Sequence, residues 1–121
     1  MGHGGDGKTS LVESLLYISG ATDRVGKVPE GNTVCDYDPE EVRRQFSIST
    51  SIAPVEWNGC KINLLDTPGF FDFESEVTSA MRVADCALIV ATGKNGPGVG
   101  TEKAWKRAAD RNMPRAFYIS K

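Results

Sequence analysis

Apolar residues recur at three- and four-residue spacing near the start of the chain, and a long stretch without any such period follows. Leu11, Leu15 and Ile18 share one face of the repeat, which predicts an amphipathic helix over residues 8–19. Residues 21–47 hold several Gly and Pro residues and are rich in charge. We therefore expect a long, partly mobile loop after the first helix, and such loops often carry function.

Two β-prone runs come next in the chain. Residues 51–57 and 60–66 are separated only by Asn58-Gly59, a strong signal for a two-residue hairpin turn. Pro54 has no backbone N–H to donate, so it places the first of these strands at the edge of its sheet. The pattern predicts an antiparallel hairpin.

The second half of the chain alternates between helical and strand patterns. Residues 74–83 and 101–111 have helical spacing, whereas the short apolar runs at 86–91 and 115–120 suit strands that are covered on both faces. The residues expected to face inward from the two helices are Val77, Met81 and Val83 or Ala84, and then Ala104, Trp105 and Ala108. This alternation predicts an α/β fold with a mostly parallel sheet flanked by helices.

The composition is that of one soluble domain. The chain has 121 residues, 40% of them hydrophobic and 25% charged, and no repeat or linker divides it, so we expect a single domain over residues 1–121. Fourteen Lys and Arg residues against 16 Asp and Glu residues leave a net charge of −2, which excludes a diffuse basic field for DNA. No apolar run reaches the roughly 18 residues of a spanning helix. We expect a cytoplasmic monomer with no DNA or membrane partner.

The three cysteines, Cys35, Cys60 and Cys86, are far apart in the sequence. They show no CxxC spacing and have no neighbouring histidines that would complete a zinc site. We expect them to be reduced residues that pack in the interior.

The start of the chain fits the phosphate-binding pattern G-x-x-x-x-G-K-[ST] in full. The motif consists of Gly2, His3, Gly4, Gly5, Asp6, Gly7, Lys8 and Thr9. Small residues let successive backbone N–H groups converge on phosphates, and the helix that starts directly behind them adds its positive end. In such a loop Lys8 would bridge the β- and γ-phosphates, the Thr9 hydroxyl would hold Mg²⁺, and Ser10 could reach the α-phosphate.

Two other interpretations of this segment stay open at this point. The same residues also spell G-x-G-x-x-G, with Asp23 near the place of the acid that binds ribose in a dinucleotide fold. Alternatively, the glycine-rich segment is only a flexible lead into the helix, since nothing but Met1 precedes Gly2.

A second motif agrees with the phosphate loop. The apolar run at residues 62–65 ends in Asp66, followed by Thr67-Pro68-Gly69. An acid at the carboxyl end of such a strand can bind Mg²⁺ through water, and the Gly69 N–H can sense a γ-phosphate. Asp-Thr-Pro-Gly is by itself also an ordinary turn sequence. Together, the two motifs favour a guanine-nucleotide switch protein over a kinase or a transporter ATPase.

Several further runs, taken in order, resemble the G domain of translational GTPases, most closely elongation factor G and elongation-factor-G-like proteins. The matching runs are Gly2-His3, residues 36–49, Asp66 to Gly69 with Asp72-Phe73, Ala84 to Ala87, and Thr101 to Trp105. The likeness covers essentially the whole chain. It implies a P-loop NTPase fold, GTP or GDP and Mg²⁺ as cofactors, and the ribosome as a partner.

The resemblance also marks departures in the two switch segments. The family's Arg-Gly-Ile-Thr-Ile pattern corresponds to residues 44–48, where Gln45 and Phe46 replace Gly and Ile, and Ser47 keeps the hydroxyl that the resemblance implies as a Mg²⁺ ligand. After Gly69, most translation factors carry a His that positions the attacking water, whereas this chain has Phe70. A phenyl ring makes no hydrogen bond to water, a contribution worth ~10²–10⁴-fold in rate. The resemblance therefore implies GTP binding more firmly than GTP hydrolysis, and it assigns no catalytic side chain.

The chain also departs from the family pattern near both of its ends. The family's loop acid falls on Gly5, with Asp6 one place later, and Ser120 stands where the guanine-reading Asn-Lys-x-Asp motif would begin. We expect an incomplete G domain, because neither a strand before Gly2 nor the rest of that motif is present. The leading hypothesis is a Mg²⁺-dependent GTP-binding switch domain. The alternatives are a nucleotide sensor with little or no hydrolysis and a non-functional fragment.

Overall fold

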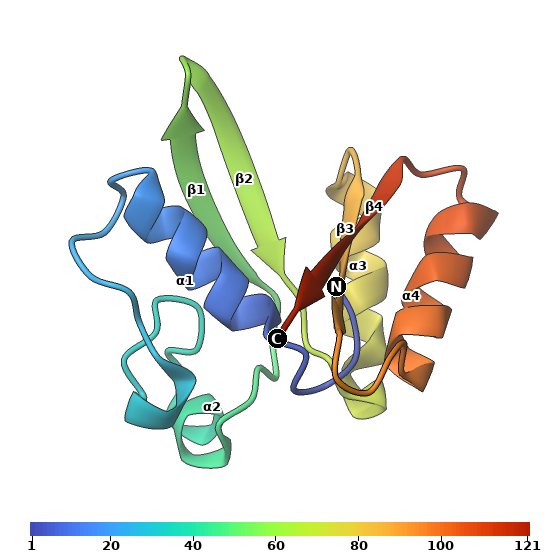
Figure 1. Cartoon of the computed structure of the whole chain (residues 1–121), viewed down its shortest axis with the longest axis horizontal. Coiled ribbons are helices and arrows are strands. Elements are labelled where there is room, and N and C mark those ends of the chain that lie inside the picture. The colour runs from blue at the N-terminus through green and yellow to red at the C-terminus, as the bar shows by residue number, and fades with distance from the viewer.

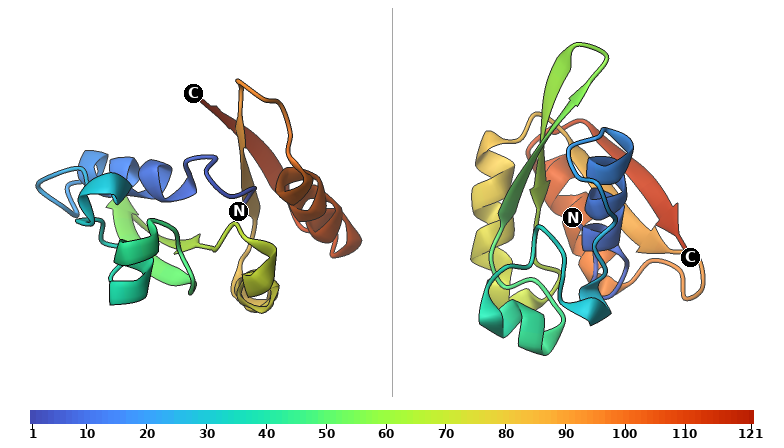
Figure 2. Two further views of the ribbon diagram at one scale, coloured as in Figure 1. Left: turned by 90° about the horizontal axis from the view of Figure 1, so that it is seen from below. Right: turned by 90° about the vertical axis from the view of Figure 1, so that its left-hand side faces the viewer.

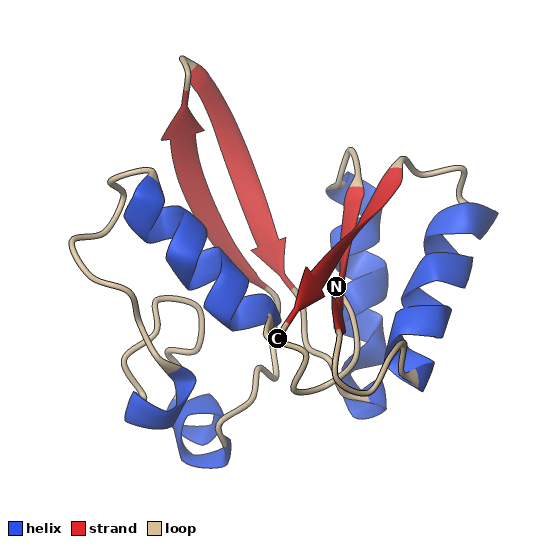
Figure 3. Cartoon of the chain, in the orientation of Figure 1, coloured by secondary structure: helices blue, strands red, loops and turns tan.

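The structure, a computed structural model, describes all residues from Met1 to Lys121. Its elements are α1 (Lys8–Ile18), η1 (Val28–Glu30), α2 (Pro39–Arg44), β1 (Ser51–Trp57), β2 (Cys60–Asp66), η2 (Phe71–Phe73), α3 (Glu74–Val83), β3 (Ala87–Thr92), α4 (Val99–Asp110) and β4 (Arg115–Ser120). Figure 3 shows the helices and strands along the chain. No helix is long and apolar enough to cross a membrane.

The strands form two separate two-stranded sheets. β1 and β2 are antiparallel, and β3 and β4 are parallel. α1 lies along the β1–β2 hairpin, whereas α3 and α4 lie beside β3 and β4 (Figure 1). The predicted α/β class is confirmed, and its sheet is divided into these two pieces.

Met1 and Gly2 add one short stretch of pairing to the sheet of β3 and β4, on the free edge of β3. Gly2 forms a parallel bridge with Val90, the Val90 N–H donates to the Met1 carbonyl at 2.8 Å, and the Met1 amine donates to the Leu88 carbonyl at 2.9 Å. A side chain at Gly2 would collide with the Val90 carbonyl, so this close approach requires glycine. The ladder along β3 stops where the chain starts.

A groove of about 780 Å³ separates the two sheets. The left view of Figure 2 shows the two sheets apart from each other, seen from below. Apolar side chains from α1, β2 and β3 line much of the groove; among them are Leu11, Leu15, Ile62, Leu64 and Leu88. β2 and β3 do not pair with each other, so β2 presents an unpaired edge to the groove and β3 an edge that pairs only with Met1 and Gly2.

The expected hairpin is present. Trp57 pairs with Cys60, and both turn residues have positive φ, 50° at Asn58 and 75° at Gly59, as a type I′ turn requires. β1 pairs only with β2, so Pro54 lies in an edge strand as predicted.

α1 packs on the hairpin through Val12 and Leu16, beside the stripe of Leu11, Leu15 and Ile18 whose spacing predicted the helix. Val12 and Leu16 are buried in a core cluster with Cys35, Ala53 and Val55, which lie in or near β1. In contrast, Leu11 and Leu15 are half-buried along the groove, and Ile18 is 65% exposed. The predicted helix over residues 8–19 is therefore confirmed, and the tertiary structure places the hairpin on the stripe that holds Val12 and Leu16.

The second core cluster lies between α3, α4 and β3. It consists of Val77, Met81, Ala87, Ala108 and Met113, with Ala84 packed against it. Of the two alternatives predicted to face inward at the end of α3, the structure selects Ala84, since Val83 is 73% exposed.

β4 is not the buried strand that its composition predicted, because four of its six residues are exposed. α4 covers part of one face, where Trp105 stacks on Phe117 with ring centroids 4.9 Å apart. Trp105 remains 39% exposed, so it caps the strand from outside and does not enter the core with Ala104 and Ala108.

The segment between α1 and β1 contains two short helices and is anchored by two buried glutamates. The Glu13 carboxylate accepts hydrogen bonds from the backbone of Gly26, Val34 and Cys35. The Glu41 carboxylate accepts from Asp38, Ile48 and Ser49. This segment was expected to be an irregular loop, since such anchors leave no periodic pattern.

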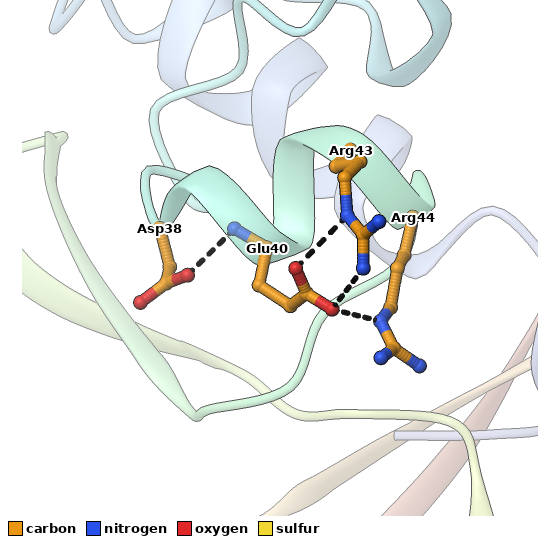
Figure 4. A network of polar contacts seen from close by, with 4 residues as sticks. All are labelled: Asp38, Glu40, Arg43 and Arg44. Carbon is orange, nitrogen blue, oxygen red and sulfur yellow. Dashed lines mark hydrogen bonds and ion pairs between the residues drawn. The ribbon is translucent and has the colours of Figure 1, made fainter.

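α2 is further stabilised at both of its ends. Asp38 caps the helix by accepting from the Glu40 N–H at 2.7 Å. The Glu40 side chain pairs with Arg43 and Arg44, as Figure 4 shows. The hydrogen bonds from these two arginines lower the pKa of Glu40 to about 2.

The cysteines differ from one another in their surroundings. All three are free thiols, but only Cys35 is buried, while Cys60 and Cys86 are exposed. The expectation that all three pack in the interior is therefore wrong for two of them. Cys60 lies beside the hairpin turn, and Cys86 lies on the groove.

Candidate phosphate-binding site

The glycine-rich segment forms a loop that ends at the N-terminus of α1. Gly5 and Gly7 have positive φ values of 80° and 89°, a region that favours glycine, and Gly7 is the N-cap of the helix. No side chain caps the first turn of α1, so its backbone N–H groups are free to meet an anion. The loop borders a cavity of about 260 Å³.

Lys8 is held inside this loop. Its side chain is largely buried, and Nζ donates to the His3 carbonyl at 2.9 Å. Burial lowers the pKa of Lys8, while Asp66 and Asp6 oppose that shift. The cation therefore lies folded over the loop, bonded to a carbonyl oxygen, and it borders the cavity that an anion would enter.

A chain of short contacts joins the three residues expected to hold Mg²⁺. The Thr9 hydroxyl donates to Asp66 at 2.7 Å, and the hydroxyl oxygens of Thr9 and Ser47 lie 3.3 Å apart. These residues come from α1, from the end of β2 and from the segment after α2. The fold thus brings together groups that are 57 and 38 residues apart in sequence.

Asp36 is a fourth member of this cluster that the sequence did not single out. Its Oδ1 accepts from the Ser47 hydroxyl at 2.6 Å, and its Oδ2 is buried with no hydrogen-bond partner. Burial raises the pKa of Asp36 and also that of Asp66. An unpartnered buried carboxylate oxygen beside two hydroxyls and a second carboxylate is a place for a cation or its water. Asp36 lies in the segment that resembles the family's first switch. This resemblance was the one feature of the sequence that could have pointed to Asp36 as a site residue.

Gly69 and Phe70 approach the loop from the end of β2. A β-carbon at Gly69 would lie 2.8 Å from the Gly4 Cα and would also collide with Lys8, so only glycine fits there. The Phe70 ring lies over Gly4, at the place where a water-positioning histidine was expected from the resemblance. Phe70 is 43% exposed and lines the cavity with its apolar ring.

Three of the predicted loop residues point their side chains elsewhere or have none to offer. Gly2 is buried against β3, and the His3 ring lies against Gly98 and Gly100 at the start of α4. The Asp6 carboxylate accepts from the Thr101 hydroxyl at 3.4 Å. These residues join the loop to its supports, and none of them lines the cavity, whereas Gly4, Gly5, Gly7, Lys8, Thr9 and Ser10 do.

The end of the chain also rests on the loop. The Ser120 hydroxyl donates to the Asp6 carbonyl at 2.6 Å, and Lys121 Nζ donates to the Gly5 carbonyl at 2.8 Å. The residue at the position of the family's guanine-reading Asn therefore contacts the loop from the carboxyl end of β4.

The donor set determines which cation suits the site. No group of three or more His, Cys, Asp or Glu side chains gathers anywhere in the chain. The hydroxyls and carboxylates beside the cavity are hard oxygen ligands, which fit Mg²⁺, an ion that normally keeps several waters and shares phosphate oxygens. The arrangement thus fits Mg²⁺ bound together with a phosphate ligand.

Comparison with known proteins agrees with this geometry. The family model described as "Elongation factor Tu GTP binding domain" matches residues 1–121. The chain is 42% identical over 121 residues to the "Elongation factor G-like protein" of Mycobacterium tuberculosis, covering 100% of the chain and 17% of that protein. It is 45% identical over 115 residues to the mitochondrial "Ribosome-releasing factor 2" of Scheffersomyces stipitis, covering 95% of the chain and 14% of that protein.

Two solved structures are also similar to the chain in fold. A crystal structure of a Thermus thermophilus protein superimposes with a TM-score of 0.95 at 42% identity, over 98% of this chain and 18% of that one. The translation elongation factor SelB of Methanococcus maripaludis, in complex with the GTP analogue GPPNHP, matches with a TM-score of 0.74 at 26% identity, over 100% of this chain and 21% of that one. The chain therefore spans about a sixth of the curated relatives named above, 17% and 14% of their lengths.

Proposed function

Since the chain belongs to the family of the elongation factor Tu GTP binding domain, we propose that it is the Mg²⁺-dependent guanine-nucleotide switch domain of a cytoplasmic elongation-factor-G-like protein that works on the ribosome. The observation that carries the proposal is the contact between Thr9, Ser47 and Asp66 beside the cavity that Lys8 borders. A phosphate loop and both switch segments meet there.

Each residue has a role that follows from its atoms. Lys8 supplies a cation to the β- and γ-phosphates, and the N–H groups of the loop and of α1, including that of Ser10, surround the phosphate chain. Thr9 and Ser47 hold Mg²⁺ through their hydroxyls, and Asp66 holds it through water. When bound, Mg²⁺ neutralises charge on the phosphate oxygens. Gly69 brings its N–H to the γ-phosphate side of the loop.

GTP binding and GTP hydrolysis separate at Phe70. A phenyl ring excludes water but cannot orient it, so we propose slow hydrolysis by the domain itself. The proposal of a nucleotide sensor with little hydrolysis rests on this one side chain. If hydrolysis becomes fast only when ribosomes are present, the group that orients the attacking water is instead supplied by the ribosome.

Nucleotide binding is tested by titrating the purified chain with fluorescent mant-GDP, mant-GTP and mant-ATP, in Mg²⁺ and in EDTA. We expect saturable binding of the guanine nucleotides, weakened by EDTA. Lys8→Ala removes a charge-assisted contact and should weaken binding about 10- to 100-fold. Lys61→Ala, on the exposed hairpin strand, is the matched control and should leave the affinity unchanged. Binding that is equal for ATP, or unaffected by Lys8→Ala, would contradict the proposal.

Hydrolysis is tested by single-turnover phosphate release from GTP, with and without ribosomes, for the natural chain and for Phe70→His. We expect the histidine variant to release phosphate at least about tenfold faster in the more active of the two conditions. Equal rates for both proteins would show that Phe70 does not limit hydrolysis.

A further inference from the structure

Two departures from the family pattern, which lie in different switch segments, touch each other in the structure. Phe46 stands where the family has Ile, and Phe70 stands where most translation factors have His. Their ring centroids are 4.6 Å apart with an interplanar angle of 53°, the tilted geometry that aromatic pairs prefer. Phe73 extends the contact, with its centroid 6.4 Å from that of Phe46.

The pair lies over the phosphate loop. Atoms of the Phe70 ring come within 3.2 to 3.4 Å of the position that a Gly4 β-carbon would take. Both rings line the 260 Å³ cavity, directly next in sequence to Ser47 and Gly69, which offer groups to Mg²⁺ and the γ-phosphate. The rings therefore line the cavity beside the residues that both predicted switch segments contribute to it.

The backbone before Phe46 directs that ring toward Phe70. Gln45 ends α2 in the left-handed region, with a φ of 58°, and its N–H donates to the Glu41 carbonyl. The buried Glu41 side chain also holds Ile48 and Ser49, so the residues on both sides of Phe46 are fixed to α2. Movement of α2 and movement of Phe46 are thereby coupled.

We propose that Phe46 and Phe70 form an aromatic latch that holds the first switch against the second, and that opening this latch limits nucleotide exchange. The second half of this inference rests on the proposed nucleotide binding. The first half concerns the protein alone. An aromatic pair of this kind shifts the equilibrium between the closed and the open latch about twofold to tenfold. A shift of that size is enough to determine how fast the latch opens.

Limited trypsin digestion tests the latch without any nucleotide. The exposed Arg43 and Arg44 lie directly before the latch and report its opening as cleavage sites, and cleavage after Lys61 or Lys106 in other elements reports general unfolding. We expect Phe46→Ala and Phe70→Ala each to speed cleavage at Arg43 and Arg44 by about twofold to tenfold relative to the other sites. The double variant should be no faster than the faster single variant, because both changes break one contact.

Phe117→Ala is the matched control. It removes one ring from the Trp105–Phe117 stack on the other sheet and should leave the relative cleavage at Arg43 and Arg44 unchanged. Phe46→Tyr keeps a stacking ring and should digest like the natural chain. Unchanged relative cleavage in the alanine variants, or an equal increase in Phe117→Ala, overturns the latch.

The second half is tested by the dissociation of mant-GDP from the chain in Mg²⁺. Phe46→Ala and Phe70→Ala should speed dissociation by the factor found for proteolysis, while Phe117→Ala should not. Faster proteolysis with unchanged dissociation overturns control of exchange and leaves the latch standing. A latch that opens as expected in a chain that binds no mant-nucleotide would instead refute the proposed function.

Discussion

Single side chains determine the shape of the segment between α1 and β1. Glu13 and Glu41 are each almost fully buried, and each carboxylate accepts hydrogen bonds from several backbone N–H groups, most of them outside its own turn. A buried carboxylate is tolerated when several donors satisfy it, and the donors in turn are costly to leave unpaired. The two glutamates thereby give a segment of low periodicity one defined path.

The adjacent residues Glu40 and Glu41 offer a matched comparison of a surface carboxylate and a buried one. Glu41→Ala leaves the N–H groups of Asp38, Ile48 and Ser49 unpartnered, and we expect a loss of about 2–3 kcal/mol in the free energy of unfolding. Urea titration measures this loss. Glu40→Ala removes only surface ion pairs and should leave the urea midpoint nearly unchanged. Equal effects of the two changes would contradict the anchoring role of Glu41.

The three thiols should react at two different rates. Cys60 and Cys86 are exposed, whereas Cys35 is buried in the first core cluster, where burial raises the pKa of its thiol. The thiolate is the reactive species, so we expect a thiol reagent such as DTNB to modify two cysteines quickly and the third only on unfolding. Counting fast thiols in the natural chain and in Cys35→Ala checks this. A fast count of three in the natural chain would contradict the core packing.

At the scale of elements, β2 and β3 each turn an edge with little or no strand pairing toward the groove. β3 pairs with β4 on one side, but on the other side it receives only Met1 and Gly2. The amine of Met1 is drawn into this ladder, where it donates to the Leu88 carbonyl. Burial lowers the pKa of that amine from 8.0 to about 6.

This shift makes stability depend on pH in a defined direction. Between pH 6 and 8 the unfolded chain binds the proton more tightly than the folded chain does, so stability is complete above pH 8 and falls as the pH drops toward 6. Two units of pKa correspond to a change of about 2–3 kcal/mol at most. Urea midpoints at a series of pH values measure it. An N-terminally acetylated chain lacks the ionisable amine and should show a flatter profile, and the same slope in both chains would contradict the assignment.

At the scale of the whole molecule, the two sheets hold two separate cores. One core joins α1 to the hairpin, and the other joins α3 and α4 to β3. The apolar groove of about 780 Å³ lies between them. The phosphate loop runs from one half to the other, so the candidate site depends on both halves keeping their relative position.

Filling the groove should stabilise the whole chain. An added N-terminal segment of about five β-branched apolar residues would extend the pairing of Met1 and Gly2 along β3. Its side chains would fill part of the apolar groove. We expect Tm to rise by about 5 °C or more, which corresponds to a gain on the order of 1 kcal/mol. A Gly-Ser segment of the same length is the control, because it adds chain without apolar surface. Equal Tm values for the two extended chains would contradict this prediction.

Local patterns in the sequence predicted what local physics controls. The hairpin turn at Asn58-Gly59 was predicted because positive φ selects those residues, and the helix over residues 74–83 was predicted from its apolar spacing. The phosphate-loop motif was recognisable because a run of small residues directly before Lys8 serves few purposes other than letting the backbone surround a phosphate. The family likeness added the positions of the two switches.

Only the tertiary structure decided which groups meet. The core face of α1, the exposure of β4, the inclusion of Asp36 and the contact between Phe46 and Phe70 depend on neighbours from distant parts of the chain. A hydrophobic period states that a face is apolar but not which element covers it, and a buried carboxylate leaves no periodic mark. The sequence by itself therefore determined most of the helices and strands and the phosphate-binding motif. Packing decided the cluster of hydroxyls and carboxylates around Ser47 and the contact between Phe46 and Phe70, because both are built from contacts that chain order does not encode.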